Sequence, residues 1–184
     1  AALNAGVMIL PGAGFDVVPT DCLANKLKNM LPDATHLEMA FAAKGGGVSR
    51  GTAKTSVRGM GHGTAMRING TIETVKWKGQ AKEINFGPFT TTCMPIPWGD
   101  LETAWVSTKI PNIKVYTPFG KHVRRNLGII SKLMRARVFK KAALFAIDKR
   151  IDGPSKVERE RSQTHVIGKV WNAKGETKSA HLAT

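Results

Sequence analysis

The stretch that decides the fold reads GFDVVPTDCLANKLKNML and runs from Gly14 to Leu31. It follows a short apolar run, Val7 to Leu10, which predicts a buried strand entering a turn. Pro19 suits the first turn of a helix, and Asp21 suits the positive end of a helix dipole. Leucines then recur at helical spacing until Pro32. The sequence therefore predicts a strand, a loop corner and a helix in succession.

Outward from this corner, strands and helices follow without a regular alternation. The spacing predicts strands over 35–42, 65–68, 71–75, 83–86, 90–94, 112–116, 164–171 and 177–182. Asn69-Gly70 is the strongest two-residue signal for a hairpin. Ser49 is expected to cap a short helix that begins at Arg50, and Asp100 to cap another. We predict an α+β fold: a mixed, largely antiparallel sheet with helices packed on one face.

Composition places the chain among single globular domains. It has 184 residues, of which 42% are hydrophobic, and this length suits one domain with its own core. Its two cysteines form no CxxC pair and its five histidines show no ligand spacing, so no metal site is predicted. No apolar run is long enough to span a membrane, and the first residues lack the basic and apolar regions of a signal peptide, so we expect none. We expect a cytoplasmic protein.

The charge is strongly basic, with a formal net charge of +15 that is concentrated in one segment. Residues 121–150 hold ten lysines and arginines and one acid, among apolar residues that predict two helices over 120–151. One interpretation is a surface that contacts an anionic membrane or a lipid-linked substrate. The other is a pair of helices packed on the sheet with a solvated basic face. Nucleic acid is disfavoured, because only Phe139 and Phe145 offer stacking aromatics there.

Two glycine-rich stretches suggest a dinucleotide-binding loop, but neither fits one. After Gly12 and Gly14, the sixth position of G-x-G-x-x-G is Val17, and the helix starts too late. No strand leads into residues 59–63. The corner from Gly14 to Asp21 has two interpretations: a place where helix amides and carboxylates meet a ligand, or a plain helix start with a solvated acid.

The corner resembles the GFDxxPxDxxA signature of saccharopine-dehydrogenase-like oxidoreductases, a group that includes trans-acting enoyl reductases. Four further blocks fall in family order and extend the resemblance over nearly the whole chain. They are Gly46-Gly47-Val48-Ser49-Arg50-Gly51-Thr52-Ala53, Ile96-Pro97-Trp98-Gly99-Asp100, Ile110-Pro111-Asn112-Ile113-Lys114-Val115-Tyr116, and Gly153-Pro154-Ser155 with Arg159.

The resemblance implies a chain that pairs with a Rossmann domain. Residues 1–184 would be the second domain, which covers the substrate and mediates dimerisation, and 1–18 the end of the link from the first. The family's GxxGxxG fingerprint is absent, so NAD(P) would be bound mainly outside these residues. The chain opens and stops within strand patterns, as we expect of a segment of a longer protein. Alone it should not transfer hydride, because the cofactor carries that chemistry.

The resemblance also implies the site residues, although it assigns no catalytic residue. The nicotinamide side of the cleft would be lined by Gly14, Phe15 and Asp16, and the substrate side by Ser49, Arg50, Thr52, Trp98 and Asp100. Arg50 is either the grip for an anionic group or a solvated arginine at a helix start. Trp98 and Asp100 are either a pocket wall or a buried tryptophan and a helix cap.

The resemblance implies two partners: a small-molecule substrate bearing an enoyl or carbonyl group, and a second copy of the chain. The basic helices over 120–151 add the expectation of a lipid-linked substrate and of peripheral contact with anionic membrane. The alternative function is a non-catalytic basic scaffold, or a module that binds membranes or other anionic ligands.

Overall fold

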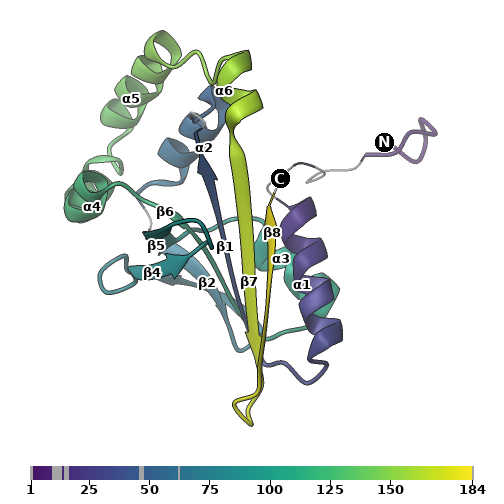
Figure 1. Cartoon of the computed structure of the whole chain (residues 1–184). Coiled ribbons are helices and arrows are strands. Elements are labelled where there is room, and N and C mark those ends of the chain that lie inside the picture. The colour runs from purple at the N-terminus through teal and green to yellow at the C-terminus, as the bar shows by residue number, and fades with distance from the viewer. Residues whose placement is uncertain (1, 10–13, 15–16, 46–47, 62, 184) are drawn as a thin grey trace.

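A computed structural model describes residues 2–9, 14, 17–45, 48–61 and 63–183, apart from the side chain at 159. Within these residues the chain forms one eight-stranded sheet and six helices (Figure 1). The sheet is mixed and mostly antiparallel, because its one parallel pair among the described strands joins β1 and β6. The predicted α+β class is confirmed.

The sheet is built around β1 (His36–Lys44). On one side β1 pairs antiparallel with β7 (Gln163–Trp171), which pairs with β8 (Thr177–Ala183). On the other side it pairs with β6 (Asn112–Pro118). The far edge of β6 meets two hairpins, formed by β2 (Thr64–Ile68) with β3 (Thr71–Val75) and by β4 (Lys82–Asn85) with β5 (Thr90–Pro95).

The turn between β2 and β3 forms as its sequence predicts. Asn69 and Gly70 adopt φ of 49° and 84°, the left-handed conformation that a two-residue hairpin turn requires. Glycine reaches this conformation at no steric cost, and asparagine tolerates it better than most residues.

Two helices cover one face of the sheet and bury the main core. These are α1 (Val18–Met30), which lies against β7 and β8, and α3 (Asp100–Thr108), which lies beside α1 and against β6 (Figure 1). Leu37 and Met39 of β1 point into this core at 1% exposure, and Leu27 of α1 meets them fully buried. Gly168 of β7 permits the close approach, because a Cβ there would lie 2.5 Å from Cδ1 of Leu27.

The opposite face carries a smaller core. The hairpin of β4 and β5 covers part of it, and its buried residues include Ala40, Ile84, Phe86 and Tyr116. A cavity of about 580 Å³ remains between this hairpin and the strands β1, β7 and β8.

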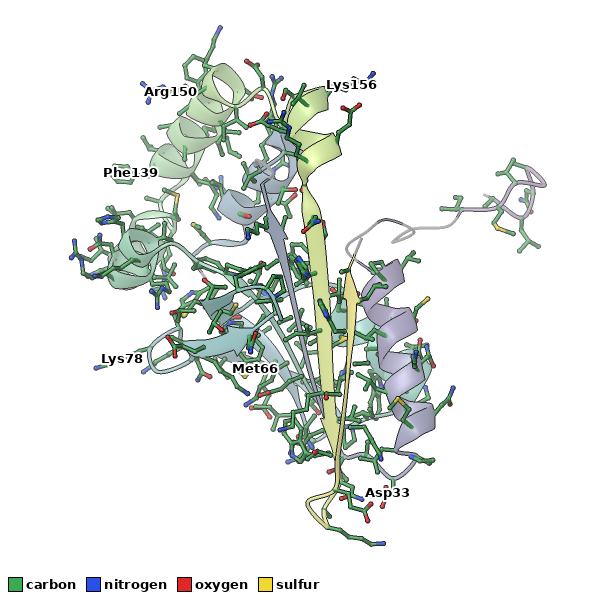
Figure 2. The ribbon with its side chains drawn as sticks, viewed as in Figure 1. Asp33, Met66, Lys78, Phe139, Arg150 and Lys156 are labelled. Atoms are coloured by element: carbon green, nitrogen blue, oxygen red, sulfur yellow. The ribbon has the colours of Figure 1, made fainter. Side chains whose placement is uncertain are left out.

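The basic segment forms two helices, as predicted: α4 (Lys121–Leu133) and α5 (Arg137–Arg150). Helix α5 packs against α2 (Arg50–Gly59), and a salt bridge of 2.5 Å joins Lys54 to Asp148. None of the described residues of α5 is buried. Figure 2 shows Phe139 and Arg150 on this outer helix.

A sixth helix, α6 (Lys156–Arg161), does not follow from hydrophobic periodicity. Its start is fixed by Ser155 and Glu158, each of which accepts a hydrogen bond from the other's backbone N–H. This is a capping box, and the spacing of serine and glutamate was the available signal.

Two local predictions are wrong. The described part of 7–10 is not a buried strand, because Val7, Met8 and Ile9 are 58–87% exposed and pair with no described strand. An apolar run alone does not make a strand without a neighbour to accept its backbone hydrogen bonds. Asp100 is the first residue of α3 rather than its cap, which is Gly99. Among the described helices, none combines the length and the apolar character that crossing a membrane demands.

Candidate functional site

The corner that precedes α1 lies against the loop that precedes α3. Thr20 donates a hydrogen bond from its hydroxyl to Oδ1 of Asp100, and both side chains are buried. A Cβ built on Gly99 would lie 3.7 Å from Cγ2 of Val17. The structure therefore brings together two segments that the sequence separates by 80 residues.

The same loop also contacts the central strand. The ring of Trp98 stacks on Phe41 of β1, with centroids 4.5 Å apart and the planes inclined by 25°. Trp98 is half-buried in this position. Strand β1 thus contacts the loop at Trp98, and the loop contacts the corner before α1 through Gly99 and Val17. These three segments therefore lie together at one end of the face that the helices cover.

Asp21 is partly buried on α1 rather than solvated. Its Oδ2 accepts a hydrogen bond of 2.9 Å from the hydroxyl of Ser107 on α3. Its Oδ1 is covered from solvent and has no donor among the described residues. Two carboxylates, Asp21 and Asp100, therefore stand at the contact between α1 and α3.

Of the predicted cofactor residues, Gly14 alone is described, since Phe15 and Asp16 lie outside the described residues. Gly14 is exposed, and a Cβ on it would meet open space. Its carbonyl accepts hydrogen bonds from the backbone N–H groups of Val17 and Val18, at 3.2 and 3.0 Å. The corner therefore presents an open glycine at the start of α1.

The predicted substrate residues of α2 make local contacts. Ser49 caps the helix as predicted, because its hydroxyl oxygen accepts from the backbone N–H of Thr52 at 3.1 Å. Arg50 donates to the backbone oxygen of Ile151 at 2.7 Å and pairs with Asp152 at 3.1 Å. Both side chains of this pair are well exposed, so the pair contributes little to stability.

A second polar cluster lines the 580 Å³ cavity on the opposite face of the sheet. Glu38 pairs with Lys82, and the hydroxyl of Tyr116 lies 3.5 Å from Oε1 of Glu38. Burial, together with the neighbouring Glu38 carboxylate, raises the pKa of the Tyr116 phenol above its ordinary value. The phenol therefore stays protonated at neutral pH. His181, which also lines this cavity, lies 3.0 Å from His165 between ring nitrogens.

Sequence reasoning did not find this cluster. One signal was present: Glu38 alternates with Leu37 and Met39, and alternation sends it to the opposite face of the sheet. Tyr116 is the single tyrosine of the chain and ends a predicted strand. No local pattern marked Lys82 as a member of this cluster, because it lies on a hairpin that is distant from Glu38 in the sequence.

Comparison with known proteins gives a fold likeness. No protein-family model matches the sequence, and no curated protein matches it. Among solved structures the fold is similar to apo histidine-tagged saccharopine dehydrogenase (L-Glu forming) from Saccharomyces cerevisiae, with a TM-score of 0.55 and 11% sequence identity. The likeness covers 98% of this chain and 60% of that one. The protein thus has a saccharopine-dehydrogenase-like α+β fold, and at this identity the likeness concerns the fold alone.

Proposed function

We propose that this chain is the substrate-side domain of an NAD(P)-dependent oxidoreductase. The observation that carries the proposal is the junction of the Gly14–Asp21 corner with the Trp98–Asp100 loop. These two segments bear the sequence blocks that resemble the saccharopine-dehydrogenase-like family. The fold likeness to saccharopine dehydrogenase supports the same proposal.

The described side chains at the corner fit the nicotinamide end of the cofactor better than its phosphates. The corner contains the partly buried carboxylate of Asp21 and the buried carboxylate of Asp100, with apolar surface from Val17 and Trp98. Carboxylates disfavour a pyrophosphate, which binds cations and free helix amides. A nucleotide-binding domain outside these residues would hold the phosphates. The cofactor supplies the hydride chemistry, and Trp98 would wall the site and exclude water.

For the substrate side, Arg50 is the candidate for an anionic group. It would have to exchange Asp152 for the substrate, and that exchange costs little because the pair is exposed. A lipid-linked enoyl or carbonyl substrate is the class we favour. The supporting observation is that α4 and α5 expose Ile129, Phe139 and Phe145 among their basic residues.

The proposal is tested with the full-length polypeptide that contains these residues. NADPH and NADH are titrated by dihydronicotinamide fluorescence, and their oxidation is assayed with ketone, imine and enoyl thioester substrates. We expect saturable binding and turnover of one substrate class. Trp98→Phe should lower kcat/KM, whereas Trp171→Phe should not, because Trp171 stacks on His36 at the start of β1. Absence of saturable binding for both cofactors refutes the proposal.

We also propose a homodimer. Among the described strands β8 pairs with β7 alone, so its outer edge is open, and an open edge is a template for pairing with another chain. Light scattering after size exclusion should give twice the mass of the chain. A proline at an outward-facing backbone N–H of β8 should yield monomers, and an unchanged mass would place the interface elsewhere.

A second candidate function is peripheral binding to anionic membrane. Helix α5 exposes Val138 by 75%, Phe139 by 50% and Phe145 by 65%, among five lysines and arginines. A helix with exposed aromatic side chains and cations suits the membrane interface. Flotation with vesicles of phosphatidylserine and phosphatidylcholine should recover the protein. Recovery should fall after Phe139→Ser with Phe145→Ser. If the unmodified protein and the double variant are recovered equally, the proposed membrane binding is refuted.

A further inference from the structure

A basic cleft separates α4 from the chain between β3 and β4. It has a volume of about 580 Å³ and lies apart from the corner and from the cavity on the open sheet face. Figure 2 shows Lys78 on the loop below α4. Six cationic side chains line it: Lys76, Lys78, Arg124, Arg125, Lys132 and Arg135.

The charge of the cleft lacks protein counterions in the described part of the chain. No acidic residue is among the described residues that line it, and none of these six cations joins an ion pair found in the described residues. Arg135 gives its Nε–H to the backbone oxygen of Gly61, a neutral acceptor. Cations gathered in one cleft repel one another, and a bound anion would relieve that repulsion.

Two donors at the cleft also lack acceptors. Nε1 of Trp77 and Nε of Arg124 are covered from solvent and have no hydrogen-bond partner among the described residues. A buried N–H without an acceptor is unfavourable, and such groups in native proteins call for an explanation. Ser131 adds a buried hydroxyl to the lining of the same cleft.

We propose that this cleft binds a phosphate monoester group. A phosphate carries a charge of about −1.5 to −2 at neutral pH and three acceptor oxygens, which suits several cations and two free N–H donors. A carboxylate offers one charge and two oxygens, and so satisfies fewer of these groups. The indole of Trp77 supplies an apolar wall for the part of the ligand that carries the phosphate. This inference does not depend on the proposed oxidoreductase function.

The first experiment measures binding of pyrophosphate and inorganic phosphate by calorimetry at low salt. We expect one site per chain. Trp77→Phe removes one N–H donor, and Arg124→Gln removes the guanidinium with its charge. Loss of a hydrogen bond to a charged group should weaken binding about tenfold to a hundredfold. Trp77→Phe keeps an aromatic ring, so it preserves the packing against Phe119. Arg137→Gln on α5 is the matched control, because Arg137 is exposed and lies outside the cleft lining.

Circular dichroism establishes whether each variant is folded. If Arg124→Gln does not fold, Trp77→Phe alone is enough to test the proposal. Absence of saturable binding, or equal affinity in Trp77→Phe, Arg137→Gln and the unmodified chain, overturns the proposal.

A second arm identifies the source of the phosphate. Vesicles of phosphatidic acid in phosphatidylcholine present the same monoester on a lipid. If pyrophosphate displaces the protein from these vesicles and Trp77→Phe weakens vesicle binding, the cleft accepts a lipid headgroup. If pyrophosphate binds in the cleft but the vesicles do not compete for it, the ligand is a soluble phosphate ester.

Discussion

Replacing Thr20 with valine removes the hydroxyl that joins α1 to α3 while it keeps the shape of the side chain. The hydroxyl donates to Oδ1 of Asp100, and the exposed fractions of the two residues are 1% and 0%. Thr20 also donates to the backbone oxygen of Val17 at 3.0 Å. The substitution therefore leaves a buried carboxylate with one donor fewer, at the junction on which the candidate site is built.

The magnitude follows from that geometry. A hydrogen bond to a charged group contributes about 1.5–3 kcal/mol. An unfolding entropy of about 2 cal/mol/K per residue gives roughly 0.4 kcal/mol/K for a chain of 184 residues. Thr20→Val should therefore lower Tm by about 4–8 °C. Thr20→Ser keeps the hydroxyl and loses one methyl group, about 0.8 kcal/mol or roughly 2 °C.

The assay is thermal unfolding followed by circular dichroism. Thr55→Val on α2 is the control, because Thr55 is exposed and its replacement should change stability by less than about 0.5 kcal/mol. A shift in Tm of about 1 °C is on the order of the control's effect. If the Tm of Thr20→Val lies that close to the Tm of the unmodified chain, the hydroxyl does not hold the two segments together.

Three further predictions concern other parts of the fold. Burial raises the pKa of the Cys93 thiol to about 12, so at about pH 8 only the exposed Cys22 should react with Ellman's reagent. Rapid reaction of two thiols per folded chain would contradict this. Gly168→Ala places a methyl against the leucines of α1 and should cost about 1–3 kcal/mol in urea unfolding; unchanged stability would mean looser packing. A hydrogen bond from Lys54 lowers the pKa of the Asp148 carboxyl. The pair therefore contributes to stability at a pH above the ordinary carboxyl pKa, and this contribution is lost as the pH falls through the lowered pKa. Amide exchange in α5, corrected for intrinsic rates, should therefore rise in acid for the native chain, while Asp148→Asn should show the raised exchange already at neutral pH.

Local chemistry was enough to predict most elements of the fold. Helix α1, the central strands and the Asn69-Gly70 hairpin follow from periodicity and from turn residues whose signals lie within a few positions. The division of the basic segment into α4 and α5 followed from its broken apolar stripe.

What depends on distant contacts was not predictable. Arg67 lies between Met66 and Ile68 in a strand, and nothing nearby marks it as buried, yet it is 4% exposed. It is buried because α3 meets it with the backbone oxygen of Leu101 and the carboxylate of Glu102. The candidate site has the same character, since the sequence blocks named its segments but not their contacts. The same holds for the cavity on the opposite face of the sheet and for the basic cleft beside α4, because tertiary folding brings their lining residues together.

The most direct test of the central claim measures how near Trp98 lies to a bound nicotinamide. In the full-length polypeptide, NADPH should quench tryptophan fluorescence by energy transfer to its dihydronicotinamide ring. Trp98→Phe should remove more of that transfer than Trp171→Phe, because Trp98 lies at the corner and Trp171 lies at the end of β7, where it stacks on His36. NADPH binding with equal transfer in the two variants, or with none, would contradict the placement of the cofactor at this corner.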